Sequence, residues 1–240
     1  MSEIRQDYVV GLIPARGGSK SIPLKNIATL GGRPMIDYVI KAAQACPEVN
    51  TIVCSTDHDQ IAQVCQERGV RVIPRPAAMA GDQSPVIEVI RHILDQMKQE
   101  LGFYPGLVVL LQPTSPFLLP EHITACVERL AAEPKADSAQ TIAPVLHNNH
   151  AFNQRVFNDG QVRFRFHEER QKAYNKQLKP KFFKFGNLVV SRAAAVLAGK
   201  DPFGDISLGV EISSPYDIDV DGPDDLEYAE FLIERGKVIL

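Results

Sequence analysis

Short apolar runs alternate with segments of helical period over the first 140 residues. Four runs rich in Val, Ile and Leu have the length of buried, mostly parallel strands: residues 8–14, 51–55, 70–73 and 107–111. Four longer segments carry apolar residues three and four positions apart, as helices do: residues 35–45, 61–68, 85–98 and 121–131. This alternation predicts a doubly wound α/β layer. Ser84 before a proline predicts a capped start for the third helix.

The pattern changes in residues 146–184, where Asn, Gln, Lys and Arg alternate with Phe. This stretch and its edge hold seven of the eleven Phe: Phe152, Phe157, Phe164, Phe166, Phe182, Phe183 and Phe185. Alternation after Asn158-Asp159-Gly160 predicts a hairpin. Two interpretations stay open, and both can hold: a β-rich insertion that covers the main sheet, and a subunit interface.

Beyond this stretch, residues 187–190 and 210–212 predict two further strands, and residues 223–235 predict a helix with acidic residues at its positive end. We find no repeat and no low-complexity tract. The chain is therefore expected to be one domain over residues 1–240, with an inserted Phe-rich subdomain at about 146–185.

Charge and composition narrow the class of protein. The 240 residues carry a formal net charge of -3, which gives no general attraction to nucleic acid or acidic lipid, although a basic local pocket remains compatible with it. No apolar stretch is long enough for a membrane span, and the first nine residues lack the apolar run of a signal peptide. The four Cys show no CxxC spacing, so reduced thiols and a cytoplasmic location are expected.

The strongest chemical signal follows the first predicted strand, in residues 13–26 (IPARGGSKSIPLKN). Ligands of open α/β sheets bind beyond the carboxyl ends of the strands. Gly17 and Gly18 permit positive φ and a close approach of backbone N–H groups to an anion, and Ser19 adds a hydroxyl. Three cations can converge on several phosphates: Arg16, Lys20 and Lys25. The alternative is a solvated basic turn. GxxxxGK[ST] and GxGxxG are absent, which disfavours a Walker NTPase and a dinucleotide-binding domain.

A second signal is the acidic stretch 216–226 near the end of the chain. If it is extended, Asp217 and Asp219 face the same way, and paired carboxylates with phosphate oxygens suit Mg²⁺. Asp221 is expected to cap the final helix, with Asp224 and Asp225 complementing its dipole. The alternative is that all five acids are structural.

The third signal is residues 110–117, again at the end of a strand. Gln112, Thr114 and Ser115 offer neutral hydrogen bonds on a turn stiffened by two prolines, which suits a hydroxyl-rich substrate. Taken alone, the segment could equally be a tight strand-to-helix connection.

In order along the chain, four motifs closely resemble those of the acylneuraminate cytidylyltransferase family: the loop 16–26, Arg75-Pro76 followed by Ala80-Gly81-Asp82, the turn 111–116, and Asp217-Ile218-Asp219. The resemblance implies a Rossmann-like nucleotidyltransferase fold and a homodimer. It also implies the reaction of CTP with a nine-carbon 2-keto sugar acid, with Mg²⁺, to give a CMP-sugar and pyrophosphate.

The resemblance also implies roles for individual residues. Catalytic roles fall to Arg16, Lys25, Asp217 and Asp219, and the last two would hold the metal. The nucleotide would be bound by Ala15, Arg16, Gly17, Gly18, Ser19, Lys20, Lys25, Asn26, Arg75 and Ser84. The sugar acid would be bound by Gln112, Thr114, Ser115, Arg170, Phe183 and Asn187.

The sugar half departs from the family pattern. Family members commonly show Arg-Gln-x-x-Pro and then Tyr-x-x-Asn-Gly, whereas this chain has Arg170-Gln171-Lys172-Ala173-Tyr174 and later Gly186-Asn187, with the last pair reversed. Sialic, legionaminic and pseudaminic acids stay open as substrates. Two alternatives are an eight-carbon 3-deoxy-octulosonic acid as substrate, and a nucleotide-binding regulator without turnover.

Overall fold

A computed structural model describes residues 3–81 and 84–240 of the chain. Asp82, part of one of the family-like motifs, lies outside the described residues. Seven strands form the central sheet in the order β11-β7-β10-β6-β1-β4-β5. Their bounds are β1 (Ile4–Pro14), β4 (Thr51–Thr56), β5 (Arg71–Pro74), β6 (Tyr104–Leu110), β7 (Ser138–Pro144), β10 (Phe183–Arg192) and β11 (Ser207–Glu211).

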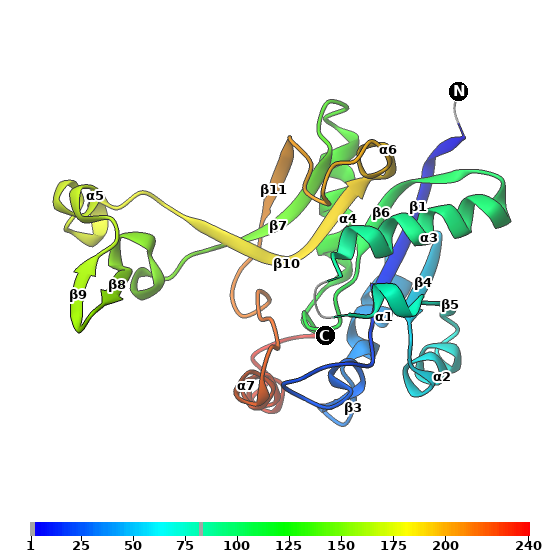
Figure 1. Cartoon of the computed structure of the whole chain (residues 1–240), viewed down its shortest axis with the longest axis horizontal. Coiled ribbons are helices and arrows are strands. Elements are labelled where there is room, and N and C mark those ends of the chain that lie inside the picture. Colours follow the sequence, from blue (N-terminus) through cyan, green and yellow to red (C-terminus); the bar gives the residue numbers. More distant parts are fainter. Residues whose placement is uncertain (1–2, 82–83) are drawn as a thin grey trace.

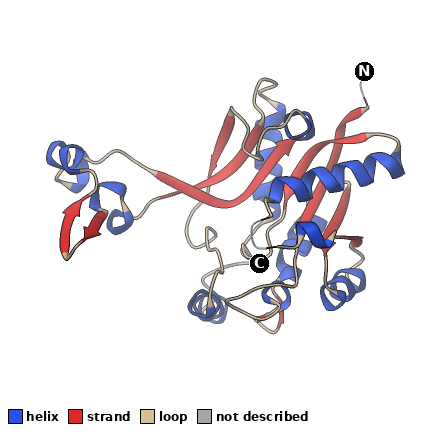
Figure 2. Cartoon of the chain, in the orientation of Figure 1, coloured by secondary structure: helices blue, strands red, loops and turns tan. Residues whose placement is uncertain are grey.

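All strands of this sheet run the same way except β10, which pairs antiparallel with both β6 and β7. Helices cover both faces (Figure 2). One apolar cluster joins the sheet to α1 (Ile36–Gln44), α2 (Asp59–Glu67) and α4 (Pro120–Ala131). A second cluster, on the other face, includes α3 (Val86–Leu101) and α6 (Ala193–Leu197). The predicted doubly wound, mostly parallel α/β layer is therefore confirmed.

A third apolar cluster lies beside the sheet. It packs α7 (Pro223–Glu234) against the short antiparallel pair β2 (Thr29–Leu30) and β3 (Arg33–Pro34). The fully buried Phe117, at the end of the turn after β6, belongs to it. This cluster brings the loop after β1, the turn after β6 and the start of α7 to one place.

The helix starts differ from expectation at one point. The residue before the first turn of α3 is Pro85, and no side chain caps it. The Ser84 hydroxyl donates instead to the carbonyl oxygen of Ala78, at 3.3 Å. The predicted capping role of Ser84 is wrong, because Pro85 and not Ser84 directly precedes the helix, and the Ser84 hydroxyl is directed to Ala78.

Between β7 and β10 the chain forms an arm, residues 145–182, that stands away from the sheet (Figure 1). The arm contains the predicted hairpin, made by β8 (Arg155–Asn158) and β9 (Gln161–Phe164), with left-handed backbone at the turn residues Asp159 and Gly160. It also contains α5 (His167–Lys172) and, among the described residues, three short 3₁₀ turns: His147–Asn149, Ala151–Asn153 and Lys176–Leu178. The expectation that this segment covers the main sheet is wrong, because β7 and β10 carry it outward.

Aromatic rings form the small core of the arm. His150 stacks on Phe182 with ring centroids 4.5 Å apart, and Phe152 meets both rings edge-on. The guanidinium group of Arg170 lies 4.1 Å from the centre of the Phe164 ring. Other apolar side chains of the arm face solvent, Phe157 being 70% exposed. The arm thus uses part of its aromatic residues internally and presents the rest.

Among the described residues, no helix has both the length and the apolar character needed to cross a membrane.

Candidate active site

A cavity of about 610 Å³ opens at the carboxyl ends of β1 and β6. From β1 the chain continues to β4 on one flank of the sheet, and from β6 it continues to β7 on the other flank, so the strand order reverses here, at the position where open α/β folds bind ligands. The cavity is lined by Pro14, Arg16, Ser19, Lys20, Ser21, Lys25, Asn26, Arg75, Met79, Gly81, Ser84, Val86, Val89, Gln112, Pro113, Thr114 and Asp221. It therefore joins parts of all three chemical signals found in the sequence.

Hydrogen bonds to neighbouring segments fix the loop after β1. The N–H of Ala15, a fully buried residue, donates to the carbonyl oxygen of Ser55 and so extends the strand pairing. The buried amide of Asn26 donates to the carbonyl oxygen of Arg16 at 2.8 Å. Asp57, after β4, accepts the N–H of Gly17 at 2.8 Å. These bonds hold Arg16, Lys20 and Lys25 around one cavity.

The two glycines of the loop act differently from expectation, because neither has positive φ. A Cβ at Gly17 would lie 2.7 Å from the His58 ring, whereas a Cβ at Gly18 would meet nothing within 4 Å. Leu24 takes the left-handed conformation instead, with φ of 48°. Its strained backbone starts the 3₁₀ turn Lys25–Ile27.

Gly17→Ala is expected to lower catalytic turnover at this cavity about 10- to 100-fold, because the new methyl group meets the Cβ and ring of His58 and the loop must move. Gly18→Ala, one residue on and in open space, is the matched control and should stay close to wild type. Steady-state rates of both variants check this. Equal rates in the two variants would show that close approach at Gly17 does not position the loop.

Arg75 forms the far wall of the cavity. It is buried, and its guanidinium group donates to the carbonyl oxygen and the hydroxyl of Ser55, at 3.0 and 3.4 Å. Burial lowers the pKa of this guanidinium group, and Asp57 opposes the shift. The wall continues through Gly81 and Ser84. Ser55 and Asp57 thus connect the end of β4 with both Arg75 and the loop after β1.

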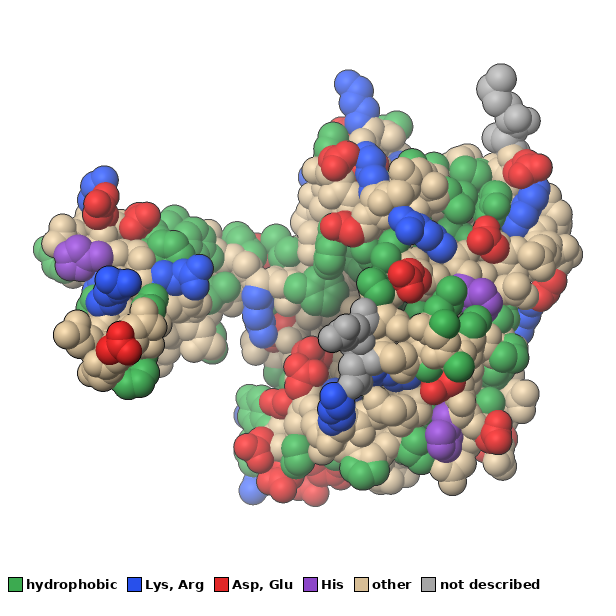
Figure 3. Space-filling view, viewed as in Figure 1, with side chains coloured by type: hydrophobic (Ala, Val, Ile, Leu, Met, Phe, Trp, Pro, Cys, Tyr) green, Lys and Arg blue, Asp and Glu red, His purple; other side chains and the backbone are tan. Residues whose placement is uncertain are grey.

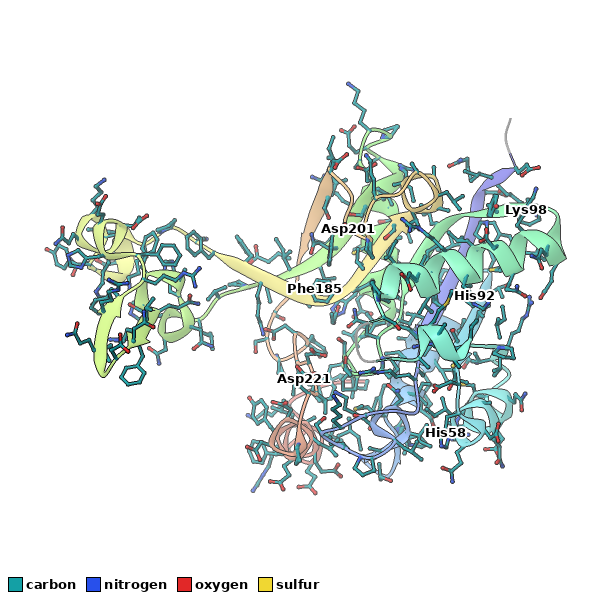
Figure 4. The ribbon with its side chains drawn as sticks, in the orientation of Figure 1. His58, His92, Lys98, Phe185, Asp201 and Asp221 are labelled. Atoms are coloured by element: carbon teal, nitrogen blue, oxygen red, sulfur yellow. The ribbon has the colours of Figure 1, made fainter. Side chains whose placement is uncertain are left out.

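Asp221 lies in the cavity rather than on the final helix (Figure 4). Its carboxylate is 3.4 Å from the ammonium group of Lys25, and its carbonyl oxygen accepts the hydroxyl of Ser21 at 2.5 Å. The residue at the start of α7 is Gly222, and Asp225 accepts the N–H groups of both Asp221 and Gly222. The expected capping role of Asp221 is therefore wrong, because Asp225 fills it.

Asp219 lies beside the cavity and makes a side-chain hydrogen bond with Thr114. The residue is exposed at its surface, while its carboxyl group lies near Thr114, Asp221 and Lys25. Partial burial there raises the pKa of the Asp219 carboxyl group, and the nearby Asp221 charge raises it further. A bound cation would relieve the repulsion between the Asp219 carboxylate and the Asp221 charge.

Asp217 does not line the cavity with them. It lies in a turn, is buried, and forms an ion pair of 2.9 Å with Lys184 of β10. The segment straightens only after it, where Val220 is fully buried between the two open residues Asp219 and Asp221. The rule that residues two apart share a side therefore applies to Asp219 and Asp221, and not to Asp217 and Asp219.

Within residues 3–81 and 84–240, no group of three or more His, Cys, Asp and Glu side chains is arranged to hold a metal ion. The pair Asp219 and Asp221 could still hold Mg²⁺, which commonly takes one or two carboxylates and completes its coordination with water and substrate phosphates. The donor set fits that mode of binding, because the cations of the loop after β1 face the same cavity.

The residues expected to bind the sugar acid divide into three groups. Gln112 and Thr114 line the cavity, whereas Ser115 is buried behind them. Asn187 is also buried, and its amide is used by Thr141, His122 and the carbonyl oxygen of Tyr216. Asn187 therefore serves the protein interior in this structure.

The third group lies on the arm and at the start of β10, which follows it. Arg170 lies on α5, remote from the cavity of its own chain, and Phe183 begins β10 with 40% of its surface exposed (Figure 1). Sequence reasoning missed several residues around the cavity. The alternation Asp219-Val220-Asp221 was a signal for Asp221, but the positions of Ser21, Leu24 and Asp57 had no such signal.

Residues 10–230 match the family model described as "Cytidylyltransferase". The chain is 38% identical over 126 residues to "N-acylneuraminate cytidylyltransferase A" of Danio rerio, which covers 52% of this chain and 28% of that protein. It is 43% identical over 122 residues to "CMP-N,N'-diacetyllegionaminic acid synthase" of Legionella pneumophila, which covers 50% of this chain and 52% of that protein. The chain thus spans about half or less of these curated relatives.

The fold also has solved counterparts. The structure titled as CMP:2-keto-3-deoxy-manno-octonic acid synthetase complexed with CTP superposes with a TM-score of 0.68 at 18% identity, covering 95% of this chain and 99% of that chain. At that identity the likeness shows the shared nucleotidyltransferase architecture. With the match over residues 10–230 and the motifs around the cavity, it leads to one conclusion: the chain belongs to the cytidylyltransferase family.

Proposed function

We propose that this chain transfers the cytidylyl group of CTP to a nine-carbon 2-keto sugar acid and releases pyrophosphate. The observation that carries the proposal is the single cavity in which the cations Arg16, Lys20 and Lys25 meet the carboxylate of Asp221. Cations for a triphosphate and carboxylates for its metal ion are the two requirements of phosphoryl-type transfer. The names of the Danio and Legionella relatives support a nonulosonic acid as the second substrate.

The proposed reaction forms one bond and breaks one bond. The anomeric hydroxyl oxygen of the sugar acid attacks the α-phosphorus of CTP, and the bond from that phosphorus to the β-phosphate oxygen breaks. The hydroxyl proton is lost to solvent, and the two outer phosphates leave as pyrophosphate. Arg16 and Lys25 stabilise the charge that develops on the phosphates, while Asn26, Arg75 and Ser84 bind the nucleoside end. Mg²⁺ held by Asp219 and Asp221 would neutralise phosphate charge.

Pyrophosphate release tests this proposal, assayed with CTP, Mg²⁺ and a panel of sialic, legionaminic and pseudaminic acids. We expect release that depends on CTP, on the metal and on at least one of these acids. Release only with an eight-carbon 3-deoxy-octulosonic acid would correct the substrate. Binding of CTP without release for any acid would instead support a regulator of the same fold.

We further propose that the protein is a homodimer joined through the arm. Exposed apolar side chains on the arm include Leu146, Phe157, Val162, Tyr174 and Leu178. Residues 145–182 carry eight Lys and Arg against three Asp and Glu, which leaves 18 basic and 26 acidic residues on the remainder of the chain. An apolar, basic arm suits the more acidic body of a second copy (Figure 3).

Two cations on the arm indicate which part reaches the second site. Arg170 and Lys179 both donate to the amide oxygen of Asn153, at 2.8 and 2.7 Å. That oxygen is neutral, so it does not balance the two positive charges. A carboxylate of the sugar acid bound in the partner's cavity would balance them. This arrangement would give Arg170 and Phe183 their expected roles across the dimer.

Mixing two inactive variants tests the crossing of the arm. Arg170→Ala would disable the arm, and Lys25→Ala would disable the cavity. Randomly mixed dimers should recover about a quarter of wild-type activity, because half the dimers are mixed and each has one intact site. Sedimentation velocity at low micromolar concentration should show a dimer. A fully active monomer would contradict the proposal, as would a dimer whose mixed variants recover nothing.

We also propose a cytoplasmic location. Cys46, Cys54, Cys65 and Cys126 are free and buried, which suits a reducing compartment.

A further inference from the structure

The chain reaches Asp219 through a turn that is attached to β10. We call β7 and β10, the two strands that carry the arm, the stem of the arm. This turn spans residues 213–217 and includes the bond from the N–H of Tyr216 to the carbonyl oxygen of Ser213, at 3.1 Å. β10 holds it with two side chains. Lys184 contacts the carboxylate of Asp217 at 2.9 Å and its carbonyl oxygen at 3.4 Å, and Asn187 donates to the carbonyl oxygen of Tyr216 at 2.9 Å.

The Asn187 side chain belongs to a buried hydrogen-bond network, and this network fixes the orientation of its amide group. Thr141 of β7 donates to the amide oxygen of Asn187, and the amide nitrogen contacts His122 of α4 at 3.0 Å. The ring of Tyr216 meets His122 edge-on, with centroids 5.8 Å apart. The turn is therefore seated on β7, β10 and α4, and β7 and β10 are the two strands that carry the arm.

Beyond the turn, the acidic segment is attached to the turn after β6 and to the loop after β1. The Asp219 side chain forms a hydrogen bond with Thr114, and Asp221 contacts Ser21 and Lys25. The N–H of Val220 donates to the carbonyl oxygen of Thr114 at 2.7 Å, and Asp225 holds the N–H of Asp221 at the far end. Asp219 lies between the turn and these two bonds. A shift of the turn would therefore change the position of Asp219 relative to Asp221.

We propose that the ion pair between Lys184 and Asp217 is a positioning contact that sets the geometry of the Asp219 and Asp221 carboxylates. It links the stem of the arm with the metal-binding segment. Asp217 is thus a residue that acts through Asp219, and not a metal ligand. This inference rests on the proposed function for its metal, but the contact itself can be tested without it.

Hydrogen exchange of the protein without metal or nucleotide provides that test. Lys184→Met removes the charge and keeps an unbranched side chain, so the amides of residues 216–221 should exchange about tenfold faster, while peptides from β1 and β6 stay unchanged. Lys135→Met, at an exposed lysine of the loop between α4 and β7, is the control for loss of a surface charge. Unchanged exchange in the acidic segment of Lys184→Met would overturn the positioning role.

A double-mutant cycle then separates positioning from ligation. With CTP bound, the half-saturating Mn²⁺ concentration should rise about tenfold in Lys184→Met, in Asp217→Asn and in the double variant alike. The exchanged pair Lys184→Asp with Asp217→Lys should recover part of the loss. Additive losses of Mn²⁺ affinity, or a much larger loss in Asp217→Asn than in Lys184→Met, would indicate that Asp217 is a ligand and would overturn the inference. Failure of the proposed function would appear differently, as absent pyrophosphate release by the wild type.

Discussion

Asp221→Asn should lower turnover by about 100-fold or more, and Asp219→Asn should do the same, with a higher Mg²⁺ requirement in both. Each change keeps the size of the side chain and removes one charge from the pair at the cavity. Rates measured over a series of Mg²⁺ concentrations check the prediction. Asp224→Asn is the matched control, because Asp224 lies in the first turn of α7 and does not line the cavity.

The substitution Asp219→Asn should not lower the stability of the fold. The pKa of Asp219 is raised in the folded protein, so the ionised carboxylate opposes folding. That cost is absent below the unfolded pKa, grows as pH rises from the unfolded to the folded pKa, and is complete above the folded pKa. Asp219→Asn should therefore melt at the same or a higher temperature at pH 7. Loss of activity together with a lower melting temperature would instead indicate a structural role, as would full activity in both cavity variants.

The second large effect is expected in the loop after β1. Arg16→Ala should cost about 100-fold or more in turnover, roughly 3 kcal/mol of transition-state stabilisation, and Lys25→Ala should be similar. Both side chains line the cavity, and cations placed against a transferring phosphate stabilise charge where it develops. Lys41→Ala, at an exposed lysine of α1, is the control. Near-normal rates in folded Arg16→Ala and Lys25→Ala would show that the triphosphate binds elsewhere.

The sequence predicted the cavity residues that directly follow an apolar strand. Apolar strands followed at once by cations, or by Gln112 and Thr114, place those residues at the carboxyl edge of a sheet. The doubly wound fold follows from the same alternation. These features are local in the sequence, so neither needs knowledge of which distant segments meet.

Other departures from expectation have a different origin, because they depend on contacts between distant segments. Aspartates alternate with apolar residues from Asp217 to Asp221, so the sequence does not show where the extended segment begins. In the structure, Asp217 belongs to a turn held by Lys184, and the extended segment begins after it. Asn187 could not be recognised as an interior residue without Thr141 and His122, which are far from it in sequence. The outward course of the arm depends on the long pairing of β7 with β10.

The fate of the α-phosphate tests the central claim most directly. The protein would be incubated with CTP labelled at the α-phosphorus, Mg²⁺ and each nonulosonic acid, and the products separated. We expect the label to appear in a CMP-sugar, with unlabelled pyrophosphate formed in equal amount, and we expect Asp221→Asn to lower both rates about 100-fold or more. Label that stays in CTP with every acid, or that appears in CDP, would contradict the claim.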